Sequence, residues 1–276
     1  MATSERRAAA TLSAWIAHAS ERLGDAGSPS PRAEAERLAA HALGVGWSDL
    51  WPVMRDAVDT TALDTVLARR MDCEPLAYIV GSVVFYGLEI ECGRGVLVPR
   101  PETETLVDVA LELIADAIEP AVCDVGTGTG AVAVAIAARR PDARICATDT
   151  STDALAWAGR NIARHGVGVE VVHGSMPHGG VDLLVSNPPY VADGTPLPPD
   201  VMAEPHEALF AGPCGDEMLV RLAADAERHR AVALEVGTPE QAETVERLLA
   251  QHGATGVRQD HTGRARVVWM RRRRAQ

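Results

Sequence analysis

Apolar residues in the first quarter of the chain recur at helical spacing. One stripe ends at the helix-stop signal Gly24 and consists of Leu12, Trp15, Ile16, Ala19 and Leu23. A second stripe runs through residues 35–43, and a third helix is expected over residues 61–71. The pattern predicts a small helical domain over residues 1–80. This domain shows no evident chemistry, so binding or orienting a substrate is its natural role.

The pattern then changes to short strands. Two apolar runs that flank Gly87 predict a β-hairpin, and residues 81–98 are expected to act as a connector. An amphipathic helix is expected to begin with Thr103 or a neighbour as its cap and to reach about Ile118. From Ala121 to Met270, strands alternate with helices. Such alternation is typical of a mostly parallel sheet with helices on both faces. The predicted fold class is α/β, with one larger domain over residues 99–276.

Composition and charge exclude several classes of function. The 276 residues contain no lysine, which removes P-loop ATPase and lysine Schiff-base chemistry. The net charge of -12 makes nucleic acid an unlikely partner, and the run Arg271–Arg274 is expected to be a solvated tail. The five cysteines form no CxxC pair, so neither a metal site nor a disulfide framework is expected. No segment reaches transmembrane length, and a cytoplasmic location is expected.

A glycine-rich loop follows the first predicted strand of the sheet. Glycines at alternate positions allow the backbone to turn sharply and to approach a ligand closely. Asp149 ends the next strand, where a carboxylate can bind the two ribose hydroxyls of a nucleoside. The loop alone leaves open whether the cofactor is NAD or S-adenosyl-L-methionine, although it lacks the longer dinucleotide pattern. It consists of Gly126, Thr127, Gly128, Thr129 and Gly130.

A second motif, Asn187-Pro188-Pro189-Tyr190, ends a buried strand at the same edge of the sheet. The side-chain carbonyl of Asn187 and the backbone carbonyl of Pro188 can accept both hydrogens of one NH2 group, and Tyr190 offers a flat face to a planar group. Positive charge develops on an amide nitrogen during methyl transfer, and two acceptors would stabilise it. This motif therefore favours a methyltransferase over an NAD enzyme. The candidate catalytic residues are Asn187, Pro188 and Tyr190.

Three acids are further candidates for a functional role. Glu102 and Glu104 form either an acid/base pair or the acidic first turn of a helix, and the second interpretation is preferred. Arg100 beside them is expected to hold the loop over the cofactor. Glu235 ends a strand on the ligand-bearing side, where a structural hydrogen bond is at least as plausible as catalysis.

The combination of motifs resembles the peptide-chain release factor N5-glutamine methyltransferases (the HemK/PrmC family). The resemblance covers nearly the whole chain and rests on residues 69–104, 126–130, 186–190 and 204–212. It implies a Rossmann-like S-adenosyl-L-methionine methyltransferase sheet behind a helical domain that contacts class 1 release factors. The implied acceptor is the glutamine amide of their Gly-Gly-Gln loop. Gly126–Gly130, Asp149, Met176 and Asn187 would bind the cofactor, and Asn187, Pro188, Pro189 and Tyr190 would bind the glutamine.

The chain departs from this family pattern at a few positions. An acidic residue is usual near the adenine, whereas the equivalent stretch here reads His173-Gly174-Ser175-Met176. Cys73 stands where glycine is usual. A nitrogen of a small molecule or peptide is therefore an alternative acceptor. Methylation of adenine in nucleic acid is a third hypothesis, which the acidity of the chain disfavours.

Overall fold

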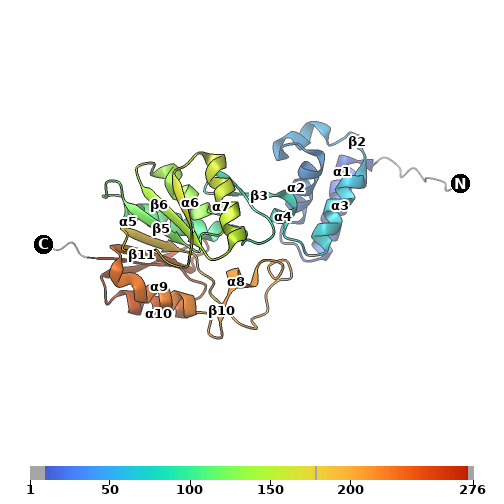
Figure 1. Ribbon diagram of the computed structural model, residues 1–276. Helices are drawn as coiled ribbons and strands as arrows, with labels where there is room; N and C mark the ends of the chain where they lie inside the picture. The colour runs from blue at the N-terminus through green and yellow to red at the C-terminus, as the bar shows by residue number, and fades with distance from the viewer. Residues whose placement is uncertain (1–9, 178, 273–276) are drawn as a thin grey trace. The chain divides into compact units, whose positions relative to one another are not determined.

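The computed structural model describes residues 10–177 and 179–272 (Figure 1). Two residues of the predicted basic tail, Arg273 and Arg274, lie outside this part of the chain, as do the first nine residues. The chain forms two compact units. One contains the described residues up to Gly81 with Pro199–Ala203, and the other contains Ser82–Pro198 and the described residues from Glu204 onward.

The first unit consists of helices around one apolar core. All five residues of the predicted N-terminal stripe are at most 4% exposed, and the helices expected at residues 35–43 and 61–71 are confirmed as α2 and α3. α4 was not predicted, because five residues are too few to show a helical period. The elements are β1 (Ala10–Thr11), α1 (Leu12–Asp25), α2 (Pro31–Leu43), η1 (Trp47–Val53), β2 (Ala57–Val58), α3 (Thr60–Met71) and α4 (Leu76–Val80).

A shielded ion pair explains why Pro199–Ala203 belongs to this unit. The Arg70 side chain, 13% exposed, donates to Glu34 at 2.9 Å and to Asp200 at 3.1 Å. Breaking such a pair leaves a shielded charge without its partner, which is strongly destabilising. Arg70 therefore ties a late segment of the chain to two early helices.

The second unit is built on a seven-stranded sheet in the order β12-β13-β11-β8-β5-β6-β7. The five strands from β11 to β7 are parallel, whereas β13 and β12 are antiparallel to their neighbours. This confirms the predicted α/β class. The strands are β5 (Ala121–Val125), β6 (Arg144–Asp149), β7 (Val169–His173), β8 (Leu183–Ser186), β11 (Ala231–Glu235), β12 (Ala254–Gln259) and β13 (Ala265–Arg271).

Helices cover both faces of the sheet, as Figure 1 shows. One apolar cluster joins the sheet to α5 and α6, and the other joins it to α9 and α10. The central strands β5, β8 and β11 are mostly apolar because both faces of the sheet are buried. The helices are α5 (Glu104–Leu113), α6 (Ala131–Arg139), α7 (Thr152–His165), α9 (Glu217–Ala224) and α10 (Pro239–Leu249). Short elements complete the unit: η2 (Pro101–Thr103), β9 (Val191–Ala192), α8 (His206–Leu209), β10 (Phe210–Gly212) and η3 (Asp225–Arg228).

The predicted hairpin is confirmed as β3 (Ser82–Phe85) and β4 (Leu88–Glu91). Its turn places Tyr86 at φ 52° and Gly87 at φ 77°, as a tight two-residue hairpin requires. The Tyr86 amide donates to Glu104 Oε1 at 2.7 Å. This contact supports the structural interpretation of Glu104.

Two details of the second unit differ from the prediction. β12 was missed because its sequence, Ala-Thr-Gly-Val-Arg-Gln, lacks a continuous apolar run. The helix expected to reach about residue 118 ends at Leu113, and Ile118 is 92% exposed. No helix among the described residues is both long and apolar enough to cross a membrane.

Candidate active site

A pocket opens at the carboxyl ends of β5, β6 and β8, inside the second unit. In an open α/β sheet this edge is where ligands bind. The glycine loop, the acid after β6 and the motif after β8 all contribute to its wall. Of the predicted site residues, those lining the pocket are Gly126, Thr127, Gly128, Thr129, Asp149, Asn187, Pro188 and Pro189.

The glycine loop forms its part of the wall with backbone. Gly126 and Gly128 have φ values of 68° and 55°, which an L side chain rarely adopts. Gly130 does not line the pocket, and a Cβ there would lie 3.1 Å from Ala158 of α7. Gly130 therefore serves the packing of α6 against α7, while the preceding residues, Gly126–Thr129, line the pocket.

Two carboxylates accept hydrogen bonds from this loop. Asp124 Oδ2 accepts the Thr127 hydroxyl at 2.6 Å and the Ala133 amide at 3.2 Å. Burial raises the pKa of Asp124 to about 6, although both hydrogen bonds favour the charged form. Asp149 accepts the Gly128 amide at 2.9 Å and the Ser151 amide at 2.9 Å, one on each oxygen. Each Asp149 oxygen keeps a further lone pair for a ligand hydroxyl.

The loop has a third support that the sequence did not reveal. Asn161 of α7 is fully buried and donates to the Thr129 carbonyl at 2.9 Å. Its side chain also pairs with both backbone groups of Glu91 in the hairpin, at 2.8 and 2.9 Å. The sequence signal for this role is an Asn on the buried face of an amphipathic helix, because a buried amide must find hydrogen-bond partners.

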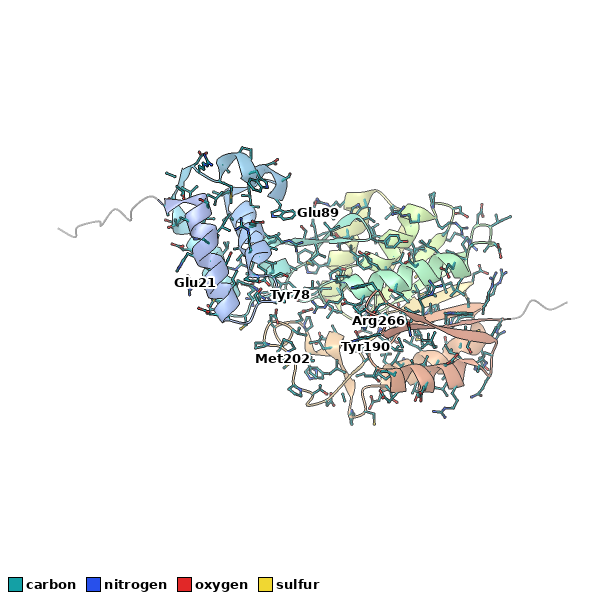
Figure 2. All side chains as sticks on the ribbon, turned by 180° about the vertical axis from the view of Figure 1, so that it is seen from behind. Glu21, Tyr78, Glu89, Tyr190, Met202 and Arg266 are labelled. Carbon is teal, nitrogen blue, oxygen red and sulfur yellow. The ribbon has the colours of Figure 1, made fainter. Side chains whose placement is uncertain are left out.

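The Asn187–Tyr190 motif is fixed on several sides. Asn187 Nδ2 donates to the Thr103 hydroxyl at 3.1 Å, which leaves Oδ1 as the free acceptor of this side chain. The Tyr190 hydroxyl donates to Glu235 Oε1 at 3.3 Å, and Gln241 donates to the Tyr190 carbonyl at 2.8 Å. Tyr190, labelled in Figure 2, is not part of the pocket wall, and burial raises its pKa.

Arg100 lies on the pocket wall. Its guanidinium is paired with Glu204, which is 6% exposed and also accepts the Val98 amide at 2.9 Å. Glu204 thereby fixes residues on both sides of Pro99. The sequence offered no local signal for this pair, because its members lie far apart in the chain.

Met176 has a different position from the other predicted cofactor contacts. Its side chain packs with the apolar cluster that contains α9, and it does not line the pocket. Gly174 and Ser175, just before it, do line the wall. The stretch after β7 thus reaches the site mainly through small residues.

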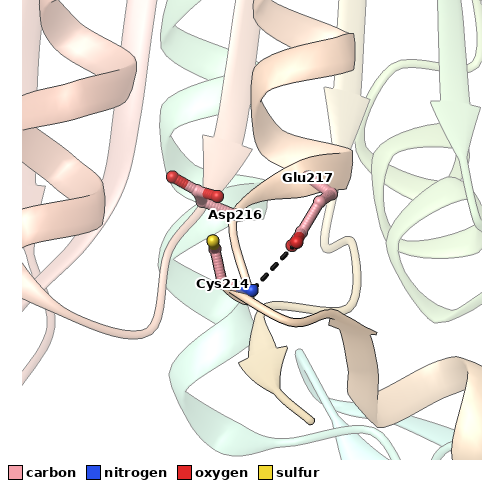
Figure 3. A group of neighbouring side chains, drawn as sticks. All are labelled: Cys214, Asp216 and Glu217. Carbon is pink, nitrogen blue, oxygen red and sulfur yellow. Dashed lines mark hydrogen bonds between the residues drawn. The ribbon is translucent and has the colours of Figure 1, made fainter.

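Another group of polar side chains lies at the start of α9 (Figure 3). Cys214, Asp216 and Glu217 bring three potential ligand atoms within 4.8 Å of one another. However, Glu217 Oε1 accepts the Cys214 backbone amide at 2.9 Å, a hydrogen bond that lowers the pKa of Glu217. The group acts as a helix start, where exposed acids are common.

Comparison with known proteins gives these features a context. The family described as the PrmC N-terminal domain matches residues 14–81, and the methyltransferase small domain matches residues 103–207. The release factor glutamine methyltransferase of Corynebacterium glutamicum is 36% identical over 95% of this chain and 99% of its own length. That of Mycolicibacterium smegmatis is 40% identical over 92% of this chain and 95% of its own length.

Solved structures show the same fold at low sequence identity. The hMettl16 catalytic domain in complex with MAT2A 3'UTR hairpin 1 aligns with a TM-score of 0.56 and 15% identity, over 77% of this chain and 79% of its own. The complex with hairpin 6 gives a TM-score of 0.55 with 18% identity, over 67% of this chain and 76% of its own.

The sheet, the glycine loop and the motif after β8 define a Rossmann-like, S-adenosyl-L-methionine-dependent methyltransferase. The fold class and the cofactor predicted from the sequence are thereby confirmed. The similarity to curated relatives runs through both units and nearly from end to end. The chain belongs to the release factor glutamine methyltransferase family.

Proposed function

We propose that the chain methylates the side-chain amide nitrogen of the glutamine in the Gly-Gly-Gln loop of class 1 release factors. The orientation of Asn187 carries this proposal. Its Nδ2 is bound to Thr103, so Oδ1 is the atom available to accept a hydrogen from an acceptor NH2 group. The relatives that match nearly the full length are named for the same reaction.

The residues of the pocket suit S-adenosyl-L-methionine. The cofactor supplies an activated methyl group on a sulfonium. The backbone of Gly126–Thr129 would hold its aminoacyl end, and Asp149 would accept hydrogen bonds from its ribose. Gly174 and Ser175 are better placed than Met176 to contact the adenine, because they line the pocket.

The motif after β8 would lower the barrier by positioning and by accepting hydrogen bonds. Asn187 Oδ1 and the Pro188 carbonyl would hold the two hydrogens of the amide nitrogen and stabilise the positive charge that develops on it. Each such bond to a charged group contributes about 1.5–3 kcal/mol. Holding the two reactants in line can contribute roughly 7–11 kcal/mol, so orientation should be the larger effect.

The helical unit, over about residues 1–80, would bind the release factor. The match to the PrmC N-terminal domain supports this role. Its surface exposes Trp47 and Trp51 at 58% and 80%, and both line a small hollow with Leu50 and Met54. Exposed tryptophans are frequent anchors of protein interfaces. A protein acceptor also suits the net charge of -12 better than a nucleic acid does. Because release factors act in translation, the enzyme would work in the cytoplasm.

The direct test is methyl transfer from S-adenosyl-L-methionine to a purified class 1 release factor. Mass spectrometry of the digested factor should show one added methyl group on the Gly-Gly-Gln peptide. A release factor with Asn in place of that glutamine is the matched control and should remain unmodified. An unmodified glutamine after full incubation with the wild-type enzyme would reject the proposed acceptor.

A further inference from the structure

The side chain of Gln241 links three loops next to the Asn187–Tyr190 motif. Its Nε2 donates to the Tyr190 carbonyl at 2.8 Å and to the Gly215 carbonyl at 3.0 Å. Its Oε1 accepts the Gly237 amide at 2.9 Å. These backbone groups belong to the end of the motif after β8, to the loop between β10 and α9, and to the turn between β11 and α10. One side-chain amide therefore holds together three segments that are separate in the sequence.

The three partners allow only one orientation of the Gln241 amide. A backbone carbonyl can only accept a hydrogen bond, and a backbone amide can only donate one. If the side-chain amide turned over, its oxygen would face two carbonyl oxygens and its NH2 group would face the Gly237 amide. In the observed orientation all three contacts are hydrogen bonds, and both hydrogens of Nε2 are used. A glutamate of the same shape could not replace these two donors.

The position of Gln241 in α10 shows that its side chain does more than cap the helix. It is the third residue of α10, and Thr238 is the N-cap, whose hydroxyl accepts the Gln241 backbone amide at 3.2 Å. In a capping box, a glutamine at this position bonds the backbone amide of the cap residue. Here the side chain bonds the amide of the preceding residue, Gly237, and both of its donors reach carbonyls outside the helix. The side chain is therefore committed to the loops around the motif.

The connection from Gln241 to the acceptor site runs through Tyr190. The Tyr190 ring lies against Gly237, where an added Cβ would be 2.6 Å from the ring, and the Tyr190 carbonyl is held by Gln241. Tyr190 is thus fixed at its side chain and at its backbone. Because the ring of Pro189 locks φ and the peptide bonds are planar, the ψ angle of Pro189 is the main rotation left between Tyr190 and the Pro188 carbonyl. Holding Tyr190 therefore restricts the direction of that carbonyl.

We propose that Gln241 is a positioning residue that directs the Pro188 carbonyl toward the acceptor NH2 group. This inference rests on the proposed role of the motif in binding an amide nitrogen. Pro188 lines the pocket, whereas Gln241 does not. The effect of Gln241 therefore reaches methyl transfer through the backbone of the motif and leaves cofactor binding unchanged.

The first test removes the two donors of Gln241 and keeps the shape of the side chain. In Gln241→Glu an ionised carboxylate faces two carbonyl oxygens, so kcat should fall roughly tenfold or more, while the Kd for S-adenosyl-L-methionine stays within about twofold. Lowering the pH protonates the new carboxyl group and returns one donor. The ratio of variant to wild-type kcat should therefore rise as the pH falls from about 9 to about 5. Gln241→Met has no titrating group, and its ratio should be low at every pH.

Two controls separate this effect from a general loss of stability. Gln251→Glu makes the same charge change at an exposed residue just after α10, and its kcat should match the wild type at every pH. Thr238→Ala removes the cap of α10, so it should lower the free energy of unfolding and keep kcat. Wild-type kcat in Gln241→Glu, a loss that is constant with pH, or an equal loss in Thr238→Ala would overturn the proposal.

The second test is independent of the acceptor. The NMR signal of the Pro188 carbonyl carbon should differ between the wild type and Gln241→Met, and it should titrate with pH in Gln241→Glu. The same signal should stay at its wild-type position in Gln251→Glu. A Pro188 signal that is unchanged in both Gln241 variants would refute the inference even if the release factor is methylated. Conversely, a displaced signal in these variants, together with a release factor that the wild type leaves unmodified, would reject the proposed acceptor and support the role of Gln241.

Discussion

Replacing Asp124 by Asn tests how the protein tolerates a carboxylate beneath the glycine loop. Asp124 is 1% exposed, and burial raises its pKa from 3.8 to about 6. The bonds from Thr127 and Ala133 both end on Oδ2. The carbonyl oxygen of an Asn side chain has the same shape and can accept both. The substitution therefore removes the charge and keeps the contacts.

The sign of the pH effect follows from the direction of the shift. The folded protein binds this proton more tightly than the unfolded chain, because the folded-state pKa is the higher one. The stabilisation is complete below about pH 4 and is lost as the pH rises through about 6. A shift of about two units corresponds to about 3 kcal/mol. Asp124→Asn lacks this titration, so its stability relative to the wild type should rise by about 3 kcal/mol between pH 4 and pH 8.

Urea unfolding of both proteins at several pH values between 4 and 8 measures this difference. Subtracting one free energy of unfolding from the other cancels the groups that titrate alike in the two proteins. The difference should change most steeply near pH 6. A difference that stays constant with pH, or one that favours the wild type as the pH rises, would show that the buried charge is stabilised by something other than the contacts described.

Three further substitutions probe the supports of the site and its surface. Asn161→Ala removes the partner of three buried or partly buried backbone groups and should lower the free energy of unfolding by about 3 kcal/mol in urea titrations; a loss under about 1 kcal/mol would contradict that role. Gly237→Ala places a Cβ 2.6 Å from the Tyr190 ring, so kcat should fall about tenfold while cofactor affinity measured by calorimetry stays unchanged; normal kcat would show that the ring position is unimportant. Trp51→Ala should leave stability within about 0.5 kcal/mol but raise the KM for a release factor; an unchanged KM would place the acceptor elsewhere.

Much of the fold could be predicted from local patterns. Most of the strands and helices from Ala121 to Met270 were predicted because continuous apolar runs and amphipathic stripes alternate there. The glycine loop and the Asn187–Tyr190 motif were visible because each is a contiguous string at the end of a strand. β12 escaped prediction because its pairing with β13, not its own composition, makes it a strand.

The contacts that shape the site were much harder to predict. Asn161, Glu204 and Thr103 act on residues remote in sequence, and nothing in their neighbourhoods indicates a partner. Thr103 was expected only as a helix cap. The direction in which a side chain points after a strand is equally hard to predict. Tyr190 and Met176 lie away from the pocket wall on which most of the other candidates meet. Their predicted contacts with acceptor and cofactor remain predictions.

The two sides of the pocket consequently differ in how they respond to substitution. The cofactor side presents mainly backbone, and Asp124, Asp149 and Asn161 hold that backbone from three different elements. Gly174 and Ser175, which stand where the family pattern has an acidic residue, take no part in this support. The acceptor side instead depends on the direction of a few hydrogen bonds around Asn187. Replacing Thr103 would remove the hydrogen bond that holds the Asn187 amide without disturbing the glycine loop, so substitutions on this side of the pocket should change methyl transfer more than cofactor binding.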